Sequence, residues 1–385
     1  MTTPRQMTPV PLSADMIRGA VEVQRTPGGL LPHRLDGRAR AQNTDGQLAM
    51  AEAQPSGVRL ALRTSARCLE VDVLPTKRRY TGMPARPDGV YDVFVDGRSA
   101  ERITAPGGST LLIDPSTGTA EHVRGAPVTL RLSDLPDGAK EVVVWLPHDE
   151  TTELVALRAD GETAPLPVRD RRTWVHHGSS ISQGSGAASS ATTWPAVAAA
   201  VAGLDLVNLG YGGSALLDPF TARLMRDLPA DVISVEIGIN LVNVDVMRLR
   251  AFGPAVHGFL DTIRDGHPRT ELIVVTPILC PMHETTPGPT AFDAASLAGG
   301  ALQFRATGEP AEAAQGKLTL QTIRAELHRI VDQRQVQDPN LRVVDGLRLY
   351  GEQDAAARPL PDGLHPDAAT HEQMGKRFAS LALHP

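Results

Sequence analysis

The chain has 385 residues, of which 41% are hydrophobic and 21% are charged, the composition of an ordinary globular protein. That length exceeds the usual size of one domain, about 100–200 residues, so two domains are expected. A net charge of −6 offers no positive field for a nucleic-acid backbone. The longest apolar runs are far shorter than the roughly 20 residues of a membrane-spanning helix. We therefore expect neither a nucleic-acid partner nor a membrane.

Two features bear on the cellular compartment. The first 19 residues, MTTPRQMTPVPLSADMIRG, contain no apolar segment of the kind found in signal peptides. Cys68 and Cys280 are the only cysteines, too few for a disulfide framework. Both features favour a reducing, cytoplasmic setting.

The first part of the chain has short alternating strands separated by turn-forming triplets such as PDG at 87–89 and 136–138. The expected strands are residues 58–62, 68–73, 90–95, 128–132 and 141–146. Strands at this spacing predict an antiparallel β-sandwich, jelly-roll-like, over residues 1–165. No amphipathic helix is evident in this part.

After residue 173 the pattern changes to apolar strands that alternate with helical segments. The expected strands are residues 173–177, 204–209, 233–237, 272–278 and 341–344, and the clearest helix is 318–333. This order predicts an α/β domain over residues 173–385, with a parallel sheet covered on both faces. Segment 161–172 is the expected linker. Segment 287–316, rich in Ala, Gly and Pro, fits a lid or a surface insertion, and its composition favours the insertion.

In an open α/β sheet, ligands bind at the carboxyl ends of the strands. Hydroxyl, amide and imidazole groups follow four of the five expected strands. The segments are GSSISQG (178–184), NLGYGGS (208–214), GIN (238–240) and, after a loop, DGLH (362–365). This arrangement predicts an active site at that edge of the sheet.

The four segments resemble the sequence blocks of the SGNH (GDSL-type) hydrolase superfamily. The first block, Gly-Asp-Ser-x-x-x-Gly, implies that Ser180 is the nucleophile. The second-block glycine corresponds to Gly213 and the third-block asparagine to Asn240. The last block, Asp-x-x-His, corresponds to Asp362 and His365.

The resemblance covers about residues 174–383 and implies a flavodoxin-like, three-layer catalytic domain. It has two departures: Ser179 stands where the family has aspartate, and Leu241 replaces an aspartate that often follows the asparagine. Neither aspartate is a triad member in the family pattern, so the departures weaken the family assignment more than the implied chemistry.

The implied roles agree with elementary chemistry. A serine hydroxyl needs an adjacent base, and His365 is suited to take the proton of Ser180 near pH 7. Asp362 would fix the tautomer of that histidine. The backbone N–H groups of Ser180 and Gly213, with the side-chain amide of Asn240, would form the oxyanion hole.

Two nucleotide-binding motifs fit the chain less well. The segment GYGGSA at 210–215 matches a dinucleotide fingerprint in form, but it follows the second strand of its domain. The acidic residue about 20 positions on, Asp231, opens a strand instead of ending one. A phosphate-binding P-loop is excluded, because residues 178–184 have the wrong spacing and no lysine follows.

A metal site is not expected either. Cys280, His283 and Glu284, with His176 and His177, are metal-ligand types, but they do not have the spacing of a four-ligand zinc site. Cys280 is more simply a buried residue at a strand end, and His283 and Glu284 are expected at the rim of a pocket. We expect no metal and no bound cofactor.

An acyl-serine intermediate can react with water or with an acceptor hydroxyl, and the triad is the same for both. The chain resembles the SGNH subgroup that carries an N-terminal β-sandwich and includes acyltransferases of tetracycline-type polyketide pathways. That resemblance implies transfer of an aryl (salicylyl) group from acyl-CoA, as co-substrate, to a hydroxylated polyketide acceptor. The alternative is a cytoplasmic esterase that hydrolyses small acyl esters of carbohydrates or natural products. Arg248 and Arg250 are candidates to face CoA, but surface solvation is the favoured explanation for them.

A hypothesis from another class is a binding or assembly protein with a silent triad. The N-terminal half of the chain has four aromatic residues, Tyr80, Tyr91, Phe94 and Trp145. These are too few for the aromatic platform of a sugar-binding sandwich. An intact set of Ser180, Asp362 and His365 favours the enzyme. The sequence does not predict the oligomeric state.

Overall fold

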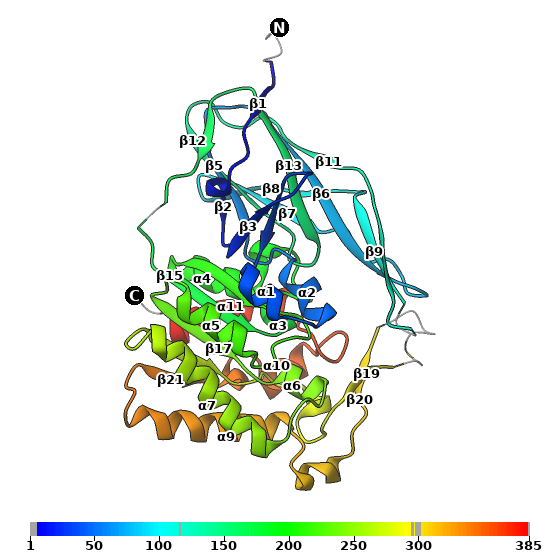
Figure 1. Ribbon diagram of the computed structural model, residues 1–385, viewed down its shortest axis with the longest axis vertical. Coiled ribbons are helices and arrows are strands. Elements are labelled where there is room, and N and C mark those ends of the chain that lie inside the picture. Colours follow the sequence, from blue (N-terminus) through cyan, green and yellow to red (C-terminus); the bar gives the residue numbers. More distant parts are fainter. Residues whose placement is uncertain (1–5, 115–116, 169, 294–295, 297–301, 384–385) are drawn as a thin grey trace. The chain divides into compact units, whose positions relative to one another are not determined.

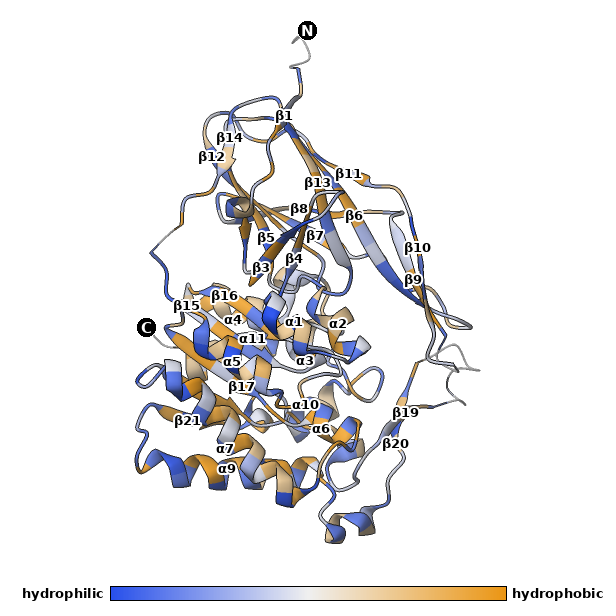
Figure 2. Ribbon diagram, in the orientation of Figure 1, coloured by the Kyte–Doolittle hydropathy of each residue, from blue (hydrophilic) through white to orange (hydrophobic). Residues whose placement is uncertain are grey.

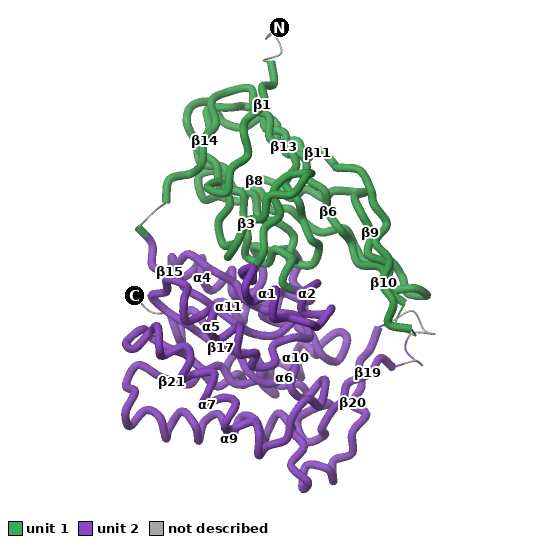
Figure 3. The backbone as a smooth tube through the Cα atoms, in the orientation of Figure 1, with its two compact units in different colours: residues 1–34, 52–170, 189–191 green, residues 35–51, 171–188, 192–385 purple. Residues whose placement is uncertain are grey.

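The computed structural model describes the chain except residues 1–5, 115–116, 169, 294–295, 297–301 and 384–385 (Figure 1). It divides into two compact units, coloured separately in Figure 3. The first comprises Met1–Arg34, Glu52–Asp170 and Ser189–Ala191, and the second comprises Leu35–Ala51, Arg171–Ala188 and Thr192–Pro385. Each unit therefore includes a short segment that interrupts the sequence of the other unit. The sequence had suggested one division, between residues 165 and 173.

The exchanged segment Leu35–Ala51 carries helices that the sequence analysis missed. Helix α1 (Gly37–Gln42) begins at Asp36, whose carboxylate accepts a hydrogen bond of 2.7 Å from the N–H of Ala39. Helix α2 (Gly46–Glu52) follows after a short turn. The sequence showed no amphipathic helix here, because helices of six and seven residues are too short to show a 3.6-residue period.

The first unit consists of two sheets. The described strands of the larger sheet run in the order β10-β9-β6-β13-β4-β3, with β1 paired to β13 and β11 to β6. The smaller runs β14-β5-β12-β7-β8, with β2 paired to β5. All pairs are antiparallel except β6 with β9, which is parallel. The strand bounds are β1 Thr8–Val10, β2 Ile17–Arg18, β3 Glu22–Arg25, β4 Leu30–His33, β5 Arg59–Thr64, β6 Leu69–Tyr80, β7 Val90–Val95, β8 Arg98–Thr104, β9 Ser109–Ile113, β10 Ala120–Val123, β11 Val128–Leu132, β12 Lys140–Trp145, β13 Thr151–Ala159 and β14 Thr163–Pro165.

Side chains from both sheets share one apolar core. Alternate residues of β12, such as Val142 and Val144, are buried. Alternate residues of β6, such as Val71 and Val73, pack in the same cluster. The two-residue period follows from the pleat of a strand, and it explains why this half was predicted as β-structure.

The second unit contains a five-stranded parallel sheet in the order β16-β15-β17-β18-β21. Its strands are β15 Thr173–Gly178, β16 Asp205–Gly210, β17 Val232–Glu236, β18 Glu271–Val275 and β21 Leu341–Val344; a separate hairpin has β19 Thr290–Phe292 and β20 Phe304–Ala306. The central strands are buried along nearly their whole length, as a sheet covered on both faces requires. The predicted α/β domain with a parallel sheet is confirmed.

Helices of the second unit pack in two groups, α4 with α11, and α5, α7 and α9 in succession. Their bounds are α3 Ser180–Gln183, α4 Trp194–Ala202, α5 Pro219–Asp227, α6 Ile239–Asn243, α7 Leu249–Gly266, α9 Leu320–Gln335, α10 Glu352–Ala357 and α11 Ala368–Ala382; 3₁₀ turns lie at Ala14–Met16, Ser190–Thr192, Pro281–His283, Pro310–Gln315 and Gly346–Arg348. Figure 2 shows polar and apolar residues alternating along α7 and α9. In the part of the chain that the structure describes, no helix is long and apolar enough to cross a membrane.

Candidate active site

The segment expected to carry the nucleophile is a sharp turn from strand β15 into helix α3. Ser179 caps the helix, since its Oγ accepts a 3.2 Å hydrogen bond from the N–H of Ile181. Ser180 is the first helical residue, with 9% of its surface exposed. Gly178 permits the turn, because a Cβ there would lie 2.3 Å from the Oγ of Ser182. The N–H groups of the first helical turn have no partner within the helix.

The predicted triad residues form a hydrogen-bonded row. Ser180 Oγ lies 2.9 Å from His365 Nε2, and His365 Nδ1 lies 2.7 Å from Asp362 Oδ2. The other carboxylate oxygen of Asp362 accepts hydrogen bonds from the N–H groups of Leu364 and His365, at 2.9 and 2.7 Å. With its Nδ1–H directed at the carboxylate, the imidazole presents the Nε2 lone pair to Ser180.

The charge state of Asp362 favours this arrangement. Burial opposes ionisation of the carboxyl group, but the hydrogen bonds from the imidazole and the backbone N–H of His365 and from the N–H of Leu364 outweigh it. The pKa of Asp362 is therefore held below its usual range. An ionised carboxylate is what stabilises an imidazolium when His365 accepts a proton.

Gly213 lies in the turn that follows strand β16. Its φ of +75° falls in the left-handed region that favours glycine. The neighbouring Gly212 donates its N–H to Gln183 Oε1 at 2.7 Å, and its carbonyl accepts from Gln47 Nε2 at 2.8 Å. Two glutamine side chains thus hold the turn from both sides. Gln47 lies on helix α2, which the sequence analysis had assigned to the other domain.

Asn240 lies in the first turn of helix α6, at the end of strand β17. Its Oδ1 accepts a 3.1 Å hydrogen bond from the N–H of Ala215. Its Nδ2 is buried and has no hydrogen-bond partner among the residues that the structure describes. The amide is therefore fixed by its oxygen and has two N–H donors left for a bound group.

Sequence reasoning missed Glu236, the last residue of β17. Its Oε2 accepts from the N–H of Ser179 at 2.8 Å and lies 3.4 Å from Ser182 Oγ. An acidic residue that ends a mostly apolar strand (VISVE) was the available signal. The carboxylate holds the residue before Ser180 in place.

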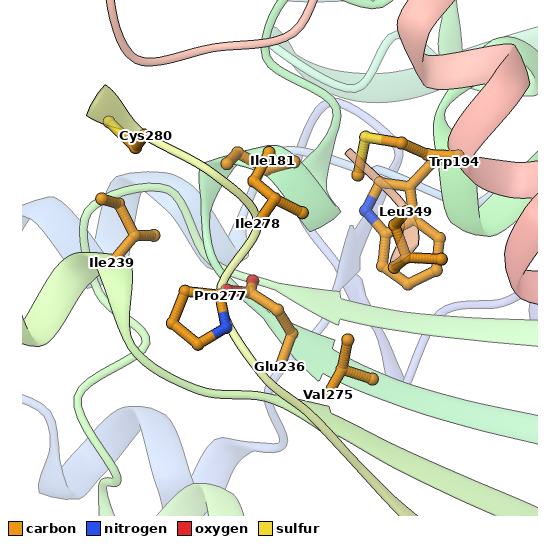
Figure 4. A pocket seen from close by; sticks show the side chains of 10 residues that line it. Ile181, Trp194, Glu236, Ile239, Val275, Pro277, Ile278, Cys280 and Leu349 are labelled. Carbon is orange, nitrogen blue, oxygen red and sulfur yellow. The ribbon is translucent and has the colours of Figure 1, made fainter. Parts of the chain in front are cut away.

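Glu236 also lines an apolar cavity beneath the nucleophile helix (Figure 4). Ile181, Ile239, Pro277 and Ile278 are among the other lining residues. A volume of about 10 Å³ leaves room for one water at most, so this is not a substrate pocket. The apolar surroundings explain why burial raises the pKa of Glu236.

Segment 287–316, expected to be a surface insertion, reaches the triad, while its residues 294–295 and 297–301 lie outside the described part. The N–H of Phe304 donates to the carbonyl of Asp362 at 2.9 Å. The ring of Phe304 meets the His365 ring edge to face, with centroids 5.8 Å apart, and lies 5.1 Å from the ring of Phe292. Composition alone could not reveal this contact.

The candidate metal ligands have other partners. Cys280 is buried and donates its Sγ–H to the carbonyl of Gly363 at 3.4 Å. His283 Nε2 lies 2.7 Å from Thr290 Oγ1, and Glu284 forms a 2.5 Å ion pair with Arg324. No group of three or more metal-ligating side chains gathers anywhere in the described residues.

The two arginines considered for CoA lie where helix α7 begins. Arg248 forms a 3.2 Å ion pair with Asp245, and its side chain is half exposed. Arg250 is exposed on the helix. The positions of these two arginines therefore do not indicate a role in binding CoA.

The fold and the site are those of an acyltransferase or esterase that is similar to enzymes of the SGNH/GDSL type. Residues 171–283 match the GDSL-like Lipase/Acylhydrolase family. Among solved structures, the chain is similar to the salicylyl-acyltransferase SsfX3 from a tetracycline biosynthetic pathway. The identity is 28%, the match covers 98% of this chain and 97% of that one, and the TM-score is 0.77. The resemblance predicted from the four sequence blocks is confirmed.

Other solved structures share the fold at lower identity. A protein described as a GDSL-like lipase from Bacteroides ovatus matches with 17% identity over 97% of this chain and 96% of that one, at a TM-score of 0.68. A family two carbohydrate esterase from Cellvibrio japonicus matches with 12% identity over 98% and 97%, at 0.56. Comparison with curated proteins gives no match.

Proposed function

We propose that the protein transfers an aryl acyl group, salicylyl, from its CoA thioester to a hydroxyl of a tetracycline-type polyketide, with an ester on Ser180 as intermediate. The observation that carries the acyl-serine chemistry is the hydrogen-bonded row of Ser180, His365 and Asp362. The similarity over 98% of the chain to a salicylyl-acyltransferase supports the substrate class.

In the first half-reaction, His365 Nε2 takes the proton of Ser180 as its Oγ attacks the thioester carbonyl. The C–S bond breaks, and the departing CoA sulfur receives that proton from His365. In the second half-reaction, His365 takes the proton of the acceptor hydroxyl, whose oxygen attacks the ester carbon. The bond to Ser180 Oγ breaks, and the serine regains its proton. Asp362 stabilises the imidazolium in both halves.

Each half-reaction passes through a tetrahedral intermediate with a negatively charged oxygen. The N–H groups of Ser180 and Gly213 and the free Nδ2 of Asn240 are the proposed donors to this oxygen. Donors that are already oriented need no rearrangement as the charge develops, and the hydrogen bond between Asn240 Oδ1 and Ala215 orients one of them.

An aromatic acyl group fits the surroundings of His365. Phe304 packs against the imidazole, Phe292 packs against Phe304, and 40% of the surface of Phe292 is exposed. Aromatic pairs contribute about 0.5–1.5 kcal/mol beyond the burial of their area. We propose that this pair contacts the aryl ring next to the ester.

A second candidate function is hydrolysis of small acyl esters, since the family match is to lipases and acylhydrolases. The same triad serves both reactions. The two differ in whether water or a hydroxyl acceptor removes the acyl group from Ser180.

The deciding experiment measures the mass of the intact protein after brief mixing with salicylyl-CoA, with Ser180→Ala as control. A salicylyl adduct on the parent protein alone, lost faster when a hydroxylated polyketide is added, is the expected result. An absent adduct, together with ready cleavage of simple acetyl esters, would replace the transferase by the esterase. A fluorophosphonate that fails to label Ser180 would mean that the triad is silent.

A further inference from the structure

The first unit contains a polar pocket of about 40 Å³ that the proposed catalysis does not use. Strand β6, the loop from β6 to β7 and the turn that precedes β13 supply its walls. Four cationic and three anionic side chains line it. The ion pairs among these side chains decide which charges remain available to a ligand.

Two ion pairs account for four of the seven charges. Lys77 Nζ lies 2.5 Å from Asp88 Oδ1 and also donates to the carbonyl of Ala105 at 2.7 Å. Arg86 Nη2 lies 3.2 Å from Asp149 Oδ2. Arg78, Arg79 and Glu150 remain, and none of them is in an ion pair that the described residues form. The remaining cations outnumber the remaining carboxylate.

Arg78 and Glu150 also carry buried polar atoms without partners. Glu150 is 4% exposed, and its Oε1 accepts from the N–H of Gly89 at 2.7 Å. Its Oε2, like the Nε of Arg78, is buried with no hydrogen-bond partner in the described part of the chain. Leaving buried polar atoms unsatisfied costs free energy, so a ligand that bonds to both atoms would be favoured.

The volume and the charge limit what that ligand can be. One water needs about 10–15 Å³ of such a cavity, so the pocket accepts a group of a few heavy atoms and excludes a sugar ring or a nucleobase. Arg78 offers a donor, and the excess of cations favours an anion. We propose that the pocket binds a phosphate-type oxyanion, which accepts hydrogen bonds from Arg78 Nε–H and from the carboxyl group of Glu150.

The electrostatics of Glu150 agree with a proton on its Oε2. Burial raises the pKa of Glu150 to about 7, with further increases from Asp149 and Asp88, against the N–H of Gly89 and the charge of Lys77. The titratable and charged groups that line the pocket with it are Lys77, Arg78, Arg79, Arg86, Asp88 and Asp149. Tyr91 also interacts with its charge, and His148 lies two residues before it in the chain. Burial lowers the pKa of His148, which adds no proton near pH 7. Binding of an anion should therefore weaken as the pH rises through 7.

The experiment titrates the full chain with sulfate by calorimetry at pH 6 and pH 8.5, because the charge of sulfate does not change in that range. We expect the Kd of the parent protein to rise about tenfold per pH unit above the pKa of Glu150. Glu150→Gln should bind at pH 8.5 as tightly as at pH 6, since its amide donates at any pH. Arg78→Gln should bind at least tenfold more weakly at both pH values. Arg98→Gln, a change at an exposed arginine on β8, is the matched control.

Failure of the parent protein to bind sulfate or inorganic phosphate at pH 6 would overturn the proposal, whatever the variants do. A pH dependence unchanged in Glu150→Gln would overturn the role of the Glu150 proton.

Inorganic phosphate, CoA and dephospho-CoA then distinguish the possible sources of the bound oxyanion. CoA binding more tightly than dephospho-CoA, with the difference lost in Arg78→Gln, means a phosphate monoester on a larger molecule. Equal binding of both, with phosphate binding tightly, means a free ion. These measurements involve no turnover, so they are independent of the catalytic proposal.

Discussion

Helix α3 of the second unit carries two serines, and each is hydrogen-bonded to a histidine. Ser180 Oγ lies 2.9 Å from His365 Nε2, and Ser182 Oγ lies 2.8 Å from His176 Nε2. The distances do not distinguish the pairs. Exposure does, because Ser182 and His176 are 0% exposed, whereas 9% of Ser180 is exposed. A substrate carbonyl can approach only the first pair.

The acid is also placed differently in the two pairs. In the first pair Asp362 accepts from the far nitrogen of the histidine. In the second, the far nitrogen of His176 faces Ser234 Oγ at 2.7 Å, and Glu236 lies on the serine side. Burial holds the pKa of His176 well below its usual value, so this histidine is a poor proton acceptor. A serine–histidine hydrogen bond therefore makes a nucleophile only with access and with an acid behind the imidazole.

Of the variants that separate the two serine–histidine pairs, Asp362→Asn is expected to have the largest effect on the reactivity of Ser180. An amide can still accept from the N–H groups of Leu364 and His365, but it offers an N–H donor to His365 Nδ1 and favours the wrong tautomer. We expect the rate of acyl-serine formation to fall by about 10⁴, as measured by intact mass. Asp367→Asn, at the cap of α11, is the matched control and should react normally. A loss below tenfold in Asp362→Asn would show that another group orients His365.

A smaller effect is expected from Asn240→Ala, which removes both the orienting oxygen and the free donors of the amide. We expect kcat to fall by about 10²–10³ with KM little changed, because an oxyanion donor acts in the transition state. Asn240→Asp keeps the acceptor for Ala215 but loses the donors, and it should be impaired at least as much. Near-normal kcat in the aspartate variant would reduce Asn240 to a positioning residue.

Features that depend on local periodicity could be predicted from the sequence. The apolar strands of the parallel sheet predicted that the polar segments after them meet at one edge, and the resemblance of those segments to the SGNH blocks then singled out Ser180, Asp362 and His365. The strand predicted at residues 272–278 ends earlier, at Val275, two residues before Pro277. A proline cannot continue the hydrogen-bonded ladder.

Features that depend on contacts between distant segments could not be predicted. Gln47 reaches Gly212 across 165 positions, and no local pattern marks a glutamine for that contact. Phe304 reaches the triad from a segment whose composition resembles a surface loop. Glu236 is the exception, because its place at the end of a buried strand is visible in the sequence. A carboxylate buried there requires hydrogen-bond donors nearby.

The smallest effect on activity is expected from Ser182→Ala. The change leaves Ser180, His365 and Asp362 untouched, so the rate of acyl-serine formation should change by no more than a few-fold. His176 Nε2 loses its buried partner, and the free energy of unfolding should fall by about 1–3 kcal/mol, as measured by urea denaturation. Ser180→Ala should give the opposite result, with acylation abolished and the unfolding free energy nearly unchanged. If Ser182→Ala were stable but unable to form the acyl-serine, the second pair would have to take part in the chemistry, and access would not be what separates the two.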